Sequence, residues 1–200
     1  MCFHSKQSKT AQALEHRFKA KVAEGVSIEP TIYNGFSFPK TPIISNQEAD
    51  KIILSNWGLM PGWAKDSSFR KNTLNARIET VKEKPSFKNY TQNRCLIIAD
   101  GFFEWKWLDE KGLKKEKYFI ELPDEQSFAF AGIWSNWVDQ KTGEIQHTYA
   151  MLTMEANALM SEIHNIKKRM PIIVSPNAEQ QWLKRGELYI ANDLLQAKLV

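Results

Sequence analysis

Hydrophobic and polar positions follow a helical period near the start of the chain. Leu14, Phe18 and Val22 recur four residues apart, with charged residues on the positions between them. This spacing places the apolar side chains on one face of a helix. The pattern therefore predicts an amphipathic helix over residues 11–23.

The middle of the chain has a different pattern, made of short apolar runs rich in β-branched and aromatic residues, which is typical of strands. Segments rich in Pro, Gly, Asp and Asn separate the runs, so antiparallel pairing of successive strands is the simplest arrangement. The predicted strands are 42–45, 51–60, 94–100, 101–108, 117–122, 128–138 and 145–154.

Helical signals return toward the end. Residues 156–164 have a helical pattern, Ser175 before Pro176 is typical of a helix start, and Gly186 is placed to end that helix. Asn192 is expected to cap a last helix. Together with the strands, these elements predict an α+β fold with a mixed, barrel-like sheet and flanking helices.

Length and composition narrow the class of protein. We expect a single domain over residues 1–200, because one core commonly spans a chain of this size. The 42% hydrophobic and 25% charged residues exclude a disordered chain. No apolar leader or membrane span is present, and two cysteines suit a reducing compartment, so we expect a cytoplasmic monomer. The net charge of +4 is compatible with a polyanionic partner without proving one.

Cys2 stands directly after the start residue, and we expect a methionine aminopeptidase to remove Met1 because the next residue is small. The exposed α-amine has an ordinary pKa of about 8, against about 10.4 for lysine, so it can attack an aldehyde at neutral pH. The thiol can then add to the imine carbon and close a five-membered thiazolidine, which an internal cysteine cannot do. Without other motifs, a cysteine at position 2 more often has no such role and merely happens to follow the start residue.

Several separated motifs resemble, in the same order, the signature segments of the SRAP family, the SOS-response-associated peptidases or abasic-site-processing proteins. The resemblance extends from residue 2 to residue 183 and implies a nucleoid-associated DNA-damage response protein without cofactor or metal. It implies binding to single-stranded DNA with abasic sites, including single-strand/duplex junctions, and a covalent link through Cys2. The motifs are the initial Met-Cys, WGLMPGWAKD at 57–66, TLNARIET at 73–80, ADGFFEW at 99–105, LTMEAN at 152–157 and IHNIKKRMPIIV at 163–174.

The resemblance places Cys2, Asn75, Glu104 and His164 on the family's active-site positions. A carboxylate at Glu104 can accept a proton from the amine, and the Asn75 amide can hold the amino terminus or the sugar oxygen. His164 can protonate the sugar ring oxygen as the ring opens to its aldehyde. Without the resemblance, a solvated charge, a turn residue and a helix cap are the commoner roles for Glu104, Asn75 and His164.

The same resemblance implies that Arg77 contacts DNA. Exposed aromatic and basic residues add candidates for base packing and phosphate contact. These candidates are Trp63, the Phe36–Pro39 loop with Phe38 and Pro39, Arg169 and Lys168, with Thr153 assisting by hydrogen bonding. Trp57, Trp134, Trp182 and Cys95 are expected in the core, and His16 and His147 at the surface.

The chain departs from the family pattern at three places. Phe3 and His4 stand where Gly and Arg are common, so the grip on DNA beside Cys2 is expected to differ. Residues 166–168 are inserted between His164 and the Arg-Met-Pro triplet, so the local loop must differ. The chain also ends at LLQAKLV without the polar C-terminal segment of many members, as a naturally short or truncated form would.

Three other functions compete with thiazolidine formation. Slow strand cleavage by β-elimination through the Schiff base would make the protein an abasic-site lyase. A cysteine peptidase, with self-cleavage after Met1, would use Cys2 as nucleophile and His164 as base. A non-covalent single-strand-binding module would need neither residue. A metal site of Cys2, His4 and His164 is disfavoured by the irregular spacing of these ligands.

Overall fold

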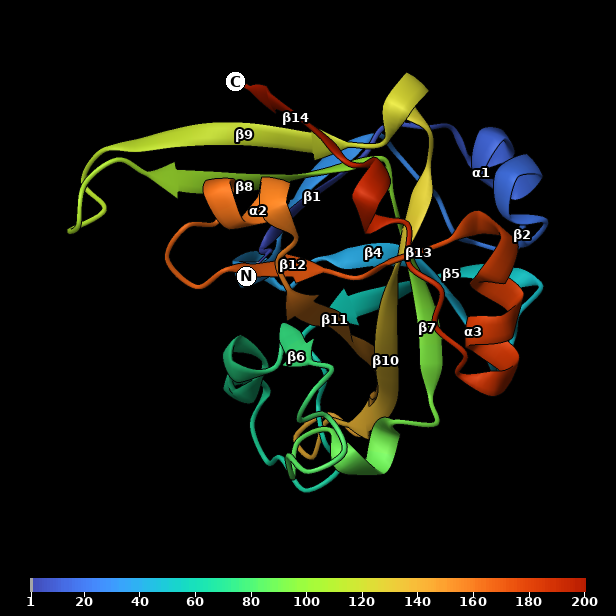
Figure 1. The fold of residues 1–200 in the computed structure, drawn as a ribbon. Helices are drawn as coiled ribbons and strands as arrows, with labels where there is room; N and C mark the ends of the chain where they lie inside the picture. The colour runs from blue at the N-terminus through green and yellow to red at the C-terminus, as the bar shows by residue number, and fades with distance from the viewer. Residues whose placement is uncertain (1) are drawn as a thin grey trace.

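The computed structural model describes residues 2–200, and within them the strands form two sheets (Figure 1). Five strands of the larger sheet close on themselves, because each pairs with the next and the last pairs again with the first. The closing pair is parallel and the other four are antiparallel, which confirms the mixed, barrel-like sheet. In order around the barrel these strands are β5 (Lys51–Trp57), β4 (Lys40–Ser45), β7 (Arg94–Ala99), β10 (Phe128–Val138) and β11 (Ile145–Glu155).

Short strands extend this barrel. β6 (Asn75–Arg77) runs parallel to β11, with Asn75 opposite Met151 and Arg77 opposite Thr153. This pairing carries two predicted site residues to the rim of the barrel. The others are β2 (Lys21–Val22) beside β5, β12 (Arg169–Pro171) beside β11 and β13 (Ile173–Val174) beside β10.

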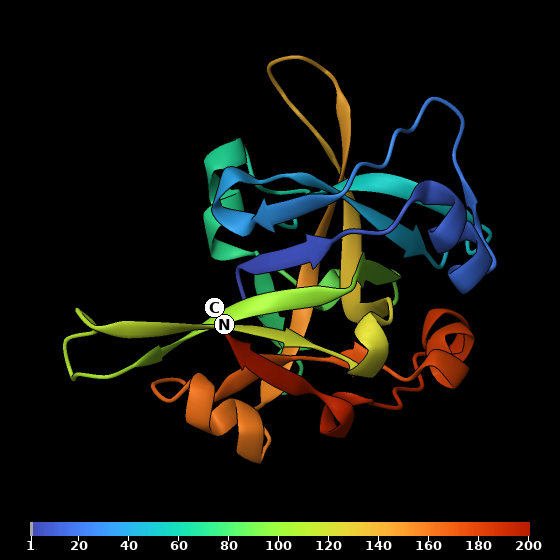
Figure 2. The ribbon, with the colours of Figure 1, turned by 90° about the horizontal axis from the view of Figure 1, so that it is seen from above.

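The second sheet is antiparallel and lies against one side of the barrel. Its central strands β8 and β9 form a hairpin whose tip projects beyond the rest of the molecule (Figures 1 and 2). In order across the sheet, the strands are β3 (Thr31–Asn34), β1 (His4–Gln7), β8 (Gly101–Trp107), β9 (Lys115–Glu121) and β14 (Gln196–Leu199).

The interior consists of two apolar layers that share strand β7. Cys95, Ile97 and Ala99 of β7 face the core between the barrel and the second sheet, where Trp57 and Phe102 also lie. The alternate residues of β7 face the layer that the helices cover. Every residue of β7 is buried because both of its faces are covered, and this explains the apolar run that follows Arg94.

The helices are short and flank the barrel. Short segments of 3₁₀ helix lie in the connections between the elements. The α-helices are α1 (Ala11–Phe18), α2 (Ala158–Ile163) and α3 (Glu179–Arg185), and the 3₁₀ turns are η1 (Gly35–Ser37), η2 (Ser67–Asn72), η3 (Lys88–Tyr90), η4 (Pro123–Glu125), η5 (Pro176–Ala178) and η6 (Asn192–Leu194). No helix within residues 2–200 is long and apolar enough to cross a membrane.

Helix ends differ from the sequence predictions at two places. The first helix ends at Phe18, because Lys19 takes a left-handed conformation with φ 53°, and Val22 lies in β2. The predicted end at residue 23 is therefore wrong. The Gly186 stop of α3 is confirmed, with φ 74° and its N–H donating to the carbonyls of the last turn. Asn192 caps no helix, since its buried side chain bonds the backbone of Ile173 and Pro171.

Strand pairing also differs from simple succession. The β4–β5, β8–β9 and β10–β11 pairs are confirmed. Pairing of β7 with β8 and of β9 with β10 is wrong, because the chain passes between the two sheets at Asp100 and at residues 122–127. Asp100 sits at the first crossing, where its carboxylate accepts from the backbone N–H of Ser8 at 2.8 Å.

Candidate active site

Cys2 is fully buried two residues before β1, in the core between the barrel and the second sheet. Its carbonyl oxygen accepts a hydrogen bond from Asn75 Nδ2 at 3.0 Å, and its Sγ donates to the His4 carbonyl oxygen at 3.5 Å. Burial raises the pKa of the Cys2 thiol well above its ordinary value, and the charge of Glu104 adds to the rise. The thiol is therefore held in its neutral form. The predicted removal of Met1 concerns a residue outside the described range.

Asn75 is fixed by the parallel pairing of β6 with β11. Its amide nitrogen is used by Cys2, while its buried Oδ1 has no hydrogen-bond partner among residues 2–200. An enclosed amide oxygen without a partner costs free energy unless a donor approaches it. Asn75 thus lies beside Cys2, bonds its carbonyl oxygen and presents an acceptor next to it.

Glu104 lies on the face of β8 that points into the molecule. Only 4% of it is exposed, so the alternative of a plain solvated charge is wrong. The register pairs His4 with Phe103, and it therefore carries the start of β1 alongside Glu104. Burial raises the pKa of the Glu104 carboxyl to about 7, so both of its protonation states are accessible near neutral pH.

His164 follows the last residue of α2, where its backbone N–H donates to Met160 O. Its Nδ1 accepts the backbone N–H of Arg169 at 3.0 Å. Burial lowers the pKa of His164 to about 4, so the ring is neutral at neutral pH. Because Nδ1 accepts, the single ring proton resides on Nε2, which makes that atom a hydrogen-bond donor.

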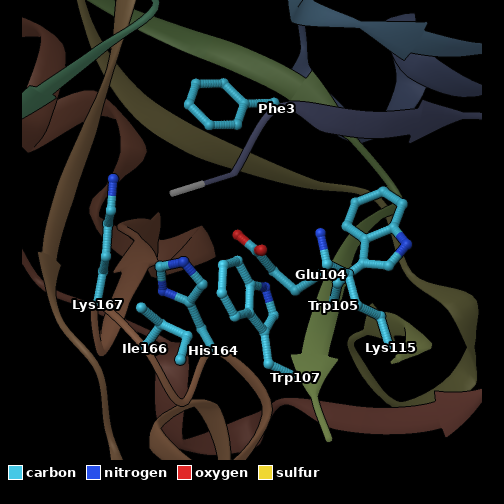
Figure 3. A pocket seen from close by; sticks show the side chains of 8 residues that line it. All are labelled: Phe3, Glu104, Trp105, Trp107, Lys115, His164, Ile166 and Lys167. Atoms are coloured by element: carbon cyan, nitrogen blue, oxygen red, sulfur yellow. The ribbon is translucent and has the colours of Figure 1, made fainter. Parts of the chain in front are cut away.

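Glu104 and His164 line one cavity of about 270 Å³. Figure 3 shows the Glu104 carboxylate and the His164 ring facing the same space, with Phe3 above it and Lys167 opposite Lys115. A second cavity of about 270 Å³ adjoins it and shares Phe3, Glu104, Trp105 and Lys115. The first is lined by Phe3, Glu104, Trp105, Trp107, Lys115, His164, Ile166 and Lys167, and the second adds His4 and Phe36.

Asn165 links the two elements that carry Glu104 and His164. Its Oδ1 accepts from Trp107 N at 3.1 Å and its Nδ2 donates to Trp107 O at 2.8 Å. The side-chain amide thus makes the two backbone hydrogen bonds that a neighbouring strand would make at this edge of β8. Asn165 was not among the predicted site residues, although it lies directly after His164 in the motif at 163–174.

The loop of residues 166–168 supplies part of the lining of the cavity. Ile166 is 52% exposed, and it lines the cavity together with Lys167. Lys168 has φ 45°, a left-handed conformation that turns the chain back toward β12. Its carbonyl accepts from Ala156 N at 3.0 Å, which closes the loop.

The predicted DNA-contacting residues fall into two groups. Arg77 is exposed, Trp63 is 53% exposed, and Phe38 and Pro39 are half-buried, so these side chains reach the surface. Thr153 is fully buried, and its Oγ1 donates to Ala76 O at 3.4 Å.

Arg169 is also buried, with 8% exposed, and it pairs with both oxygens of Glu79 at 2.8 and 2.9 Å. Its guanidinium also donates to the Thr153 carbonyl oxygen at 2.8 Å. In this conformation Thr153 and Arg169 brace the strands beneath the site, so neither side chain lies open to a bound strand.

The remaining aromatic, cysteine and histidine predictions have one error. Cys95 and the three expected core tryptophans are buried, and His16 is exposed. His147, predicted at the surface, is half-buried. Its Nδ1 lies 2.7 Å from Ser55 Oγ and its ring stacks on Trp134 at 4.7 Å, so burial lowers its pKa to about 4.

His4 packs edge-on against Trp105 with ring centroids 4.9 Å apart. Burial lowers the pKa of His4, and the charge of Lys117 lowers it further, so this residue is uncharged at neutral pH. No three His, Cys, Asp or Glu side chains in the described part of the chain are grouped so as to hold a metal ion.

Comparison with known proteins matches this arrangement to one family. Residues 1–198 match the family model described as SOS response associated peptidase (SRAP). Abasic site processing protein YoqW of Bacillus subtilis is 40% identical over 142 residues, 70% of this chain and 61% of that protein. Abasic site processing protein HMCES of Mus musculus is 30% identical over 192 residues, 81% of this chain and 52% of that protein. The matches thus span about half to three fifths of these relatives.

Solved structures agree with the sequence match. A crystal structure of a protein from Bacteroides thetaiotaomicron is 33% identical with a TM-score of 0.86, covering 100% of this chain and 92% of that one. A structure from Bordetella bronchiseptica, 24% identical, covers 100% of this chain and 99% of its own with a TM-score of 0.81, which shows the shared fold. Since the family model matches nearly the whole chain, the protein belongs to the SOS response associated peptidase (SRAP) family.

Proposed function

We propose that this protein processes abasic sites in single-stranded DNA by forming a covalent thiazolidine with the sugar aldehyde through Cys2, once Met1 has been removed. The observation that carries the proposal is the Cys2 backbone held by Asn75 beside a cavity that Glu104 and His164 both line. Relatives that carry the name abasic site processing protein support the same substrate.

The protonation states suggest the order of steps. As the sugar ring opens to the aldehyde, the anomeric hydroxyl loses its proton to water and the ring oxygen gains one from water, while the neutral His164 ring donates an Nε2–H hydrogen bond to that oxygen. The Cys2 α-amine then attacks the aldehyde carbon, water leaves, and a carbon–nitrogen double bond forms. Glu104 accepts the proton that the amine loses and can return one to the departing oxygen, because a carboxyl with a pKa of about 7 exchanges protons readily near neutral pH.

The thiol acts second. Since burial keeps the Cys2 thiol neutral, the amine is the stronger nucleophile of the pair in the resting site. Sγ then adds to the imine carbon, the carbon–sulfur bond forms, and the thiol proton passes to the nitrogen. This step closes the five-membered ring and removes the imine. Strand cleavage by β-elimination requires that imine, so ring closure competes with lyase activity.

The site geometry favours this proposal over a cysteine peptidase. A peptidase dyad needs a thiolate beside a protonated or proton-accepting imidazole. Here burial shifts Cys2 toward the thiol and His164 toward the neutral ring, and Nδ1 of His164 is already engaged by the Arg169 backbone. Both shifts oppose a thiolate–imidazolium pair.

Intact-mass analysis after mixing with a single-stranded abasic oligonucleotide tests the proposal. We expect an adduct that persists without borohydride for the protein lacking Met1. Cys2→Ala keeps the amine, so it is expected to give only an imine that requires borohydride trapping. A protein with confirmed Met1 removal that forms no persistent adduct would refute the proposal.

A further inference from the structure

A second basic and aromatic surface lies outside the site, on the outward side of the second sheet. We call it the outer face and define it by Lys6 of β1, Phe103, Trp105 and Trp107 of β8, and Lys115, Lys117 and Phe119 of β9. The register places them on one side, because Phe103 pairs with Phe119, Trp105 with Lys117, Trp107 with Lys115, and Lys6 with Gly101. Glu104 and Glu116 alternate with these residues and point to the other side.

Lysines and aromatic rings alternate across this face. The Lys6 ammonium lies 5.0 Å from the Phe119 ring centroid, and that of Lys117 lies 4.2 Å from Phe103 and 6.0 Å from Trp105. The Lys115 ammonium lies 4.8 Å from the Trp107 ring, and Phe103 and Phe119 are 5.0 Å apart. Phe103 is buried beneath Lys117, whereas the Trp105, Trp107 and Phe119 rings are partly exposed, so these three rings can offer stacking surfaces with a cation beside them.

The charge on this side of the sheet is almost wholly positive. According to the strand register, two further charged residues of the five strands lie on this side of the sheet. They are Lys198 and Glu121, which form an ion pair with each other. Lys6, Lys115 and Lys117 remain without carboxylate neighbours on that side. A strand with a negative backbone is the charge-complementary ligand for such a surface.

The outer face is also continuous with the site. Trp105 and Lys115 line both cavities that contain Glu104, and Lys117 lies over the same Trp105 ring. A strand that leaves the cavities past Trp105 therefore meets Lys117, Phe119 and Lys6 in turn. Figure 2 shows that the β8–β9 hairpin projects away from the barrel, and Lys115 on it is exposed.

We infer that the outer face binds the single-stranded DNA that continues beyond the abasic site, with phosphates held by the lysines and bases stacked on the rings. The inference rests on the proposed function for its ligand. The arrangement lets the protein hold a flanking strand without reading its sequence, since stacking and phosphate contact are both tolerant of base identity.

The test compares binding to unmodified oligothymidylate with crosslinking to a short abasic strand. Lys6→Glu/Lys117→Glu should weaken binding of an oligomer of about 20 nucleotides by about tenfold and lower the salt slope by about 1.4, for two lost phosphate contacts. The crosslinking rate with an abasic oligomer of about 6 nucleotides, at saturating concentration, should remain that of the parent.

The matched control is Lys82→Glu/Lys184→Glu, which makes the same charge change at exposed lysines by turn 79–84 and on α3. It should leave the salt slope unchanged. Equal behaviour of the two double variants would overturn the inference. Phe119→Leu, which keeps apolar bulk, should weaken binding about fivefold through lost stacking. If polyglutamate displaces the bound oligomer as well as unlabelled oligothymidylate does, the surface binds any polyanion and the inference is overturned.

Two readouts separate this inference from the proposed function. Binding of unmodified DNA does not require Cys2 chemistry. If no adduct forms but Lys6→Glu/Lys117→Glu still lowers the salt slope, only the proposed function is refuted. A normal adduct with control-like binding by Lys6→Glu/Lys117→Glu would refute only the outer face. Thermal unfolding of each variant excludes misfolding as the cause.

Discussion

Cysteine and histidine each occur in two contrasting regions of the molecule. His164 lines the cavity that holds Glu104, and Cys2 directly precedes Phe3, which lines it too, whereas Cys95 and His147 are packed at the barrel. Both thiols are fully buried with raised pKa values, and burial lowers the pKa of both histidines to about 4. Shifted titration alone therefore does not mark a reactive site. The difference is the cavity and the buried Glu104 that only the first pair adjoins.

The sharpest way to break this comparison is to remove each thiol in turn. Cys2→Ala should abolish the persistent adduct, because only an N-terminal aminothiol can close the ring. Cys95→Ala should retain it and lower the free energy of unfolding by about 1 kcal/mol through lost packing. Intact mass and urea unfolding give the two readouts. A persistent adduct from Cys2→Ala would contradict the comparison.

The two histidines provide the next largest contrast. His164→Ala should slow crosslinking about a hundredfold, as expected for loss of the hydrogen-bond donor that stabilises the negative charge developing on the sugar oxygen. His147→Ala should keep the rate while destabilising the fold, since it leaves Ser55 Oγ without its present partner. Single-turnover rates on a saturating abasic strand measure both. Equal slowing in both variants would show that His164 acts only through the fold.

The buried carboxyl makes a pH-dependent prediction. Folding raises the Glu104 pKa from its ordinary 4.5 to about 7, so the folded state binds its proton more tightly than the unfolded state does. The resulting stability is full below pH 4.5 and is lost as the pH rises through 7. Glu104→Gln mimics the neutral form, so it should match the parent at pH 4 and exceed it by about 1–3 kcal/mol at pH 8.

Urea unfolding of the parent and Glu104→Gln across that range checks the sign. The difference between the two curves isolates Glu104 from the histidines, whose lowered pKa values act in the opposite direction and cancel between parent and variant. A constant difference at all pH values would show that the carboxyl is not shifted.

The smallest expected effect concerns Asn165, which joins the His164 loop to β8. Asn165→Ala should slow crosslinking about fivefold without changing affinity for unmodified DNA, because the loop then samples positions outside reacting distance. Asn165→Asp should be slower still, since its second oxygen faces the Trp107 carbonyl, whereas Asn165→Gln offers the same amide groups and should recover part of the rate. An unchanged rate in Asn165→Asp would assign the amide a purely structural role.

Local pattern was enough to predict most strands, because apolar runs such as the fully buried β7 need no partner to be recognised. Barrel closure was not predictable, since the parallel β11–β5 pair joins Thr148 to Asn56 and depends on how distant segments meet. Likewise, strand alternation assigns Glu104 to a face but cannot say which face is inward. The family resemblance predicted Glu104 as a site residue, whereas the contact of Asn165 with β8 was found only in the structure.

β6 fixes the distance between two predicted site residues at the rim of the barrel. Asn75 and Arg77 are two residues apart on one extended strand, which spaces them by about 7 Å on the same face. Asn75 is tied to the Cys2 carbonyl, while Ala76 between them is buried and anchors the strand. The spacing between the nucleophile's anchor and the exposed arginine is thus set by backbone geometry, and rearrangement of surface side chains leaves it unchanged.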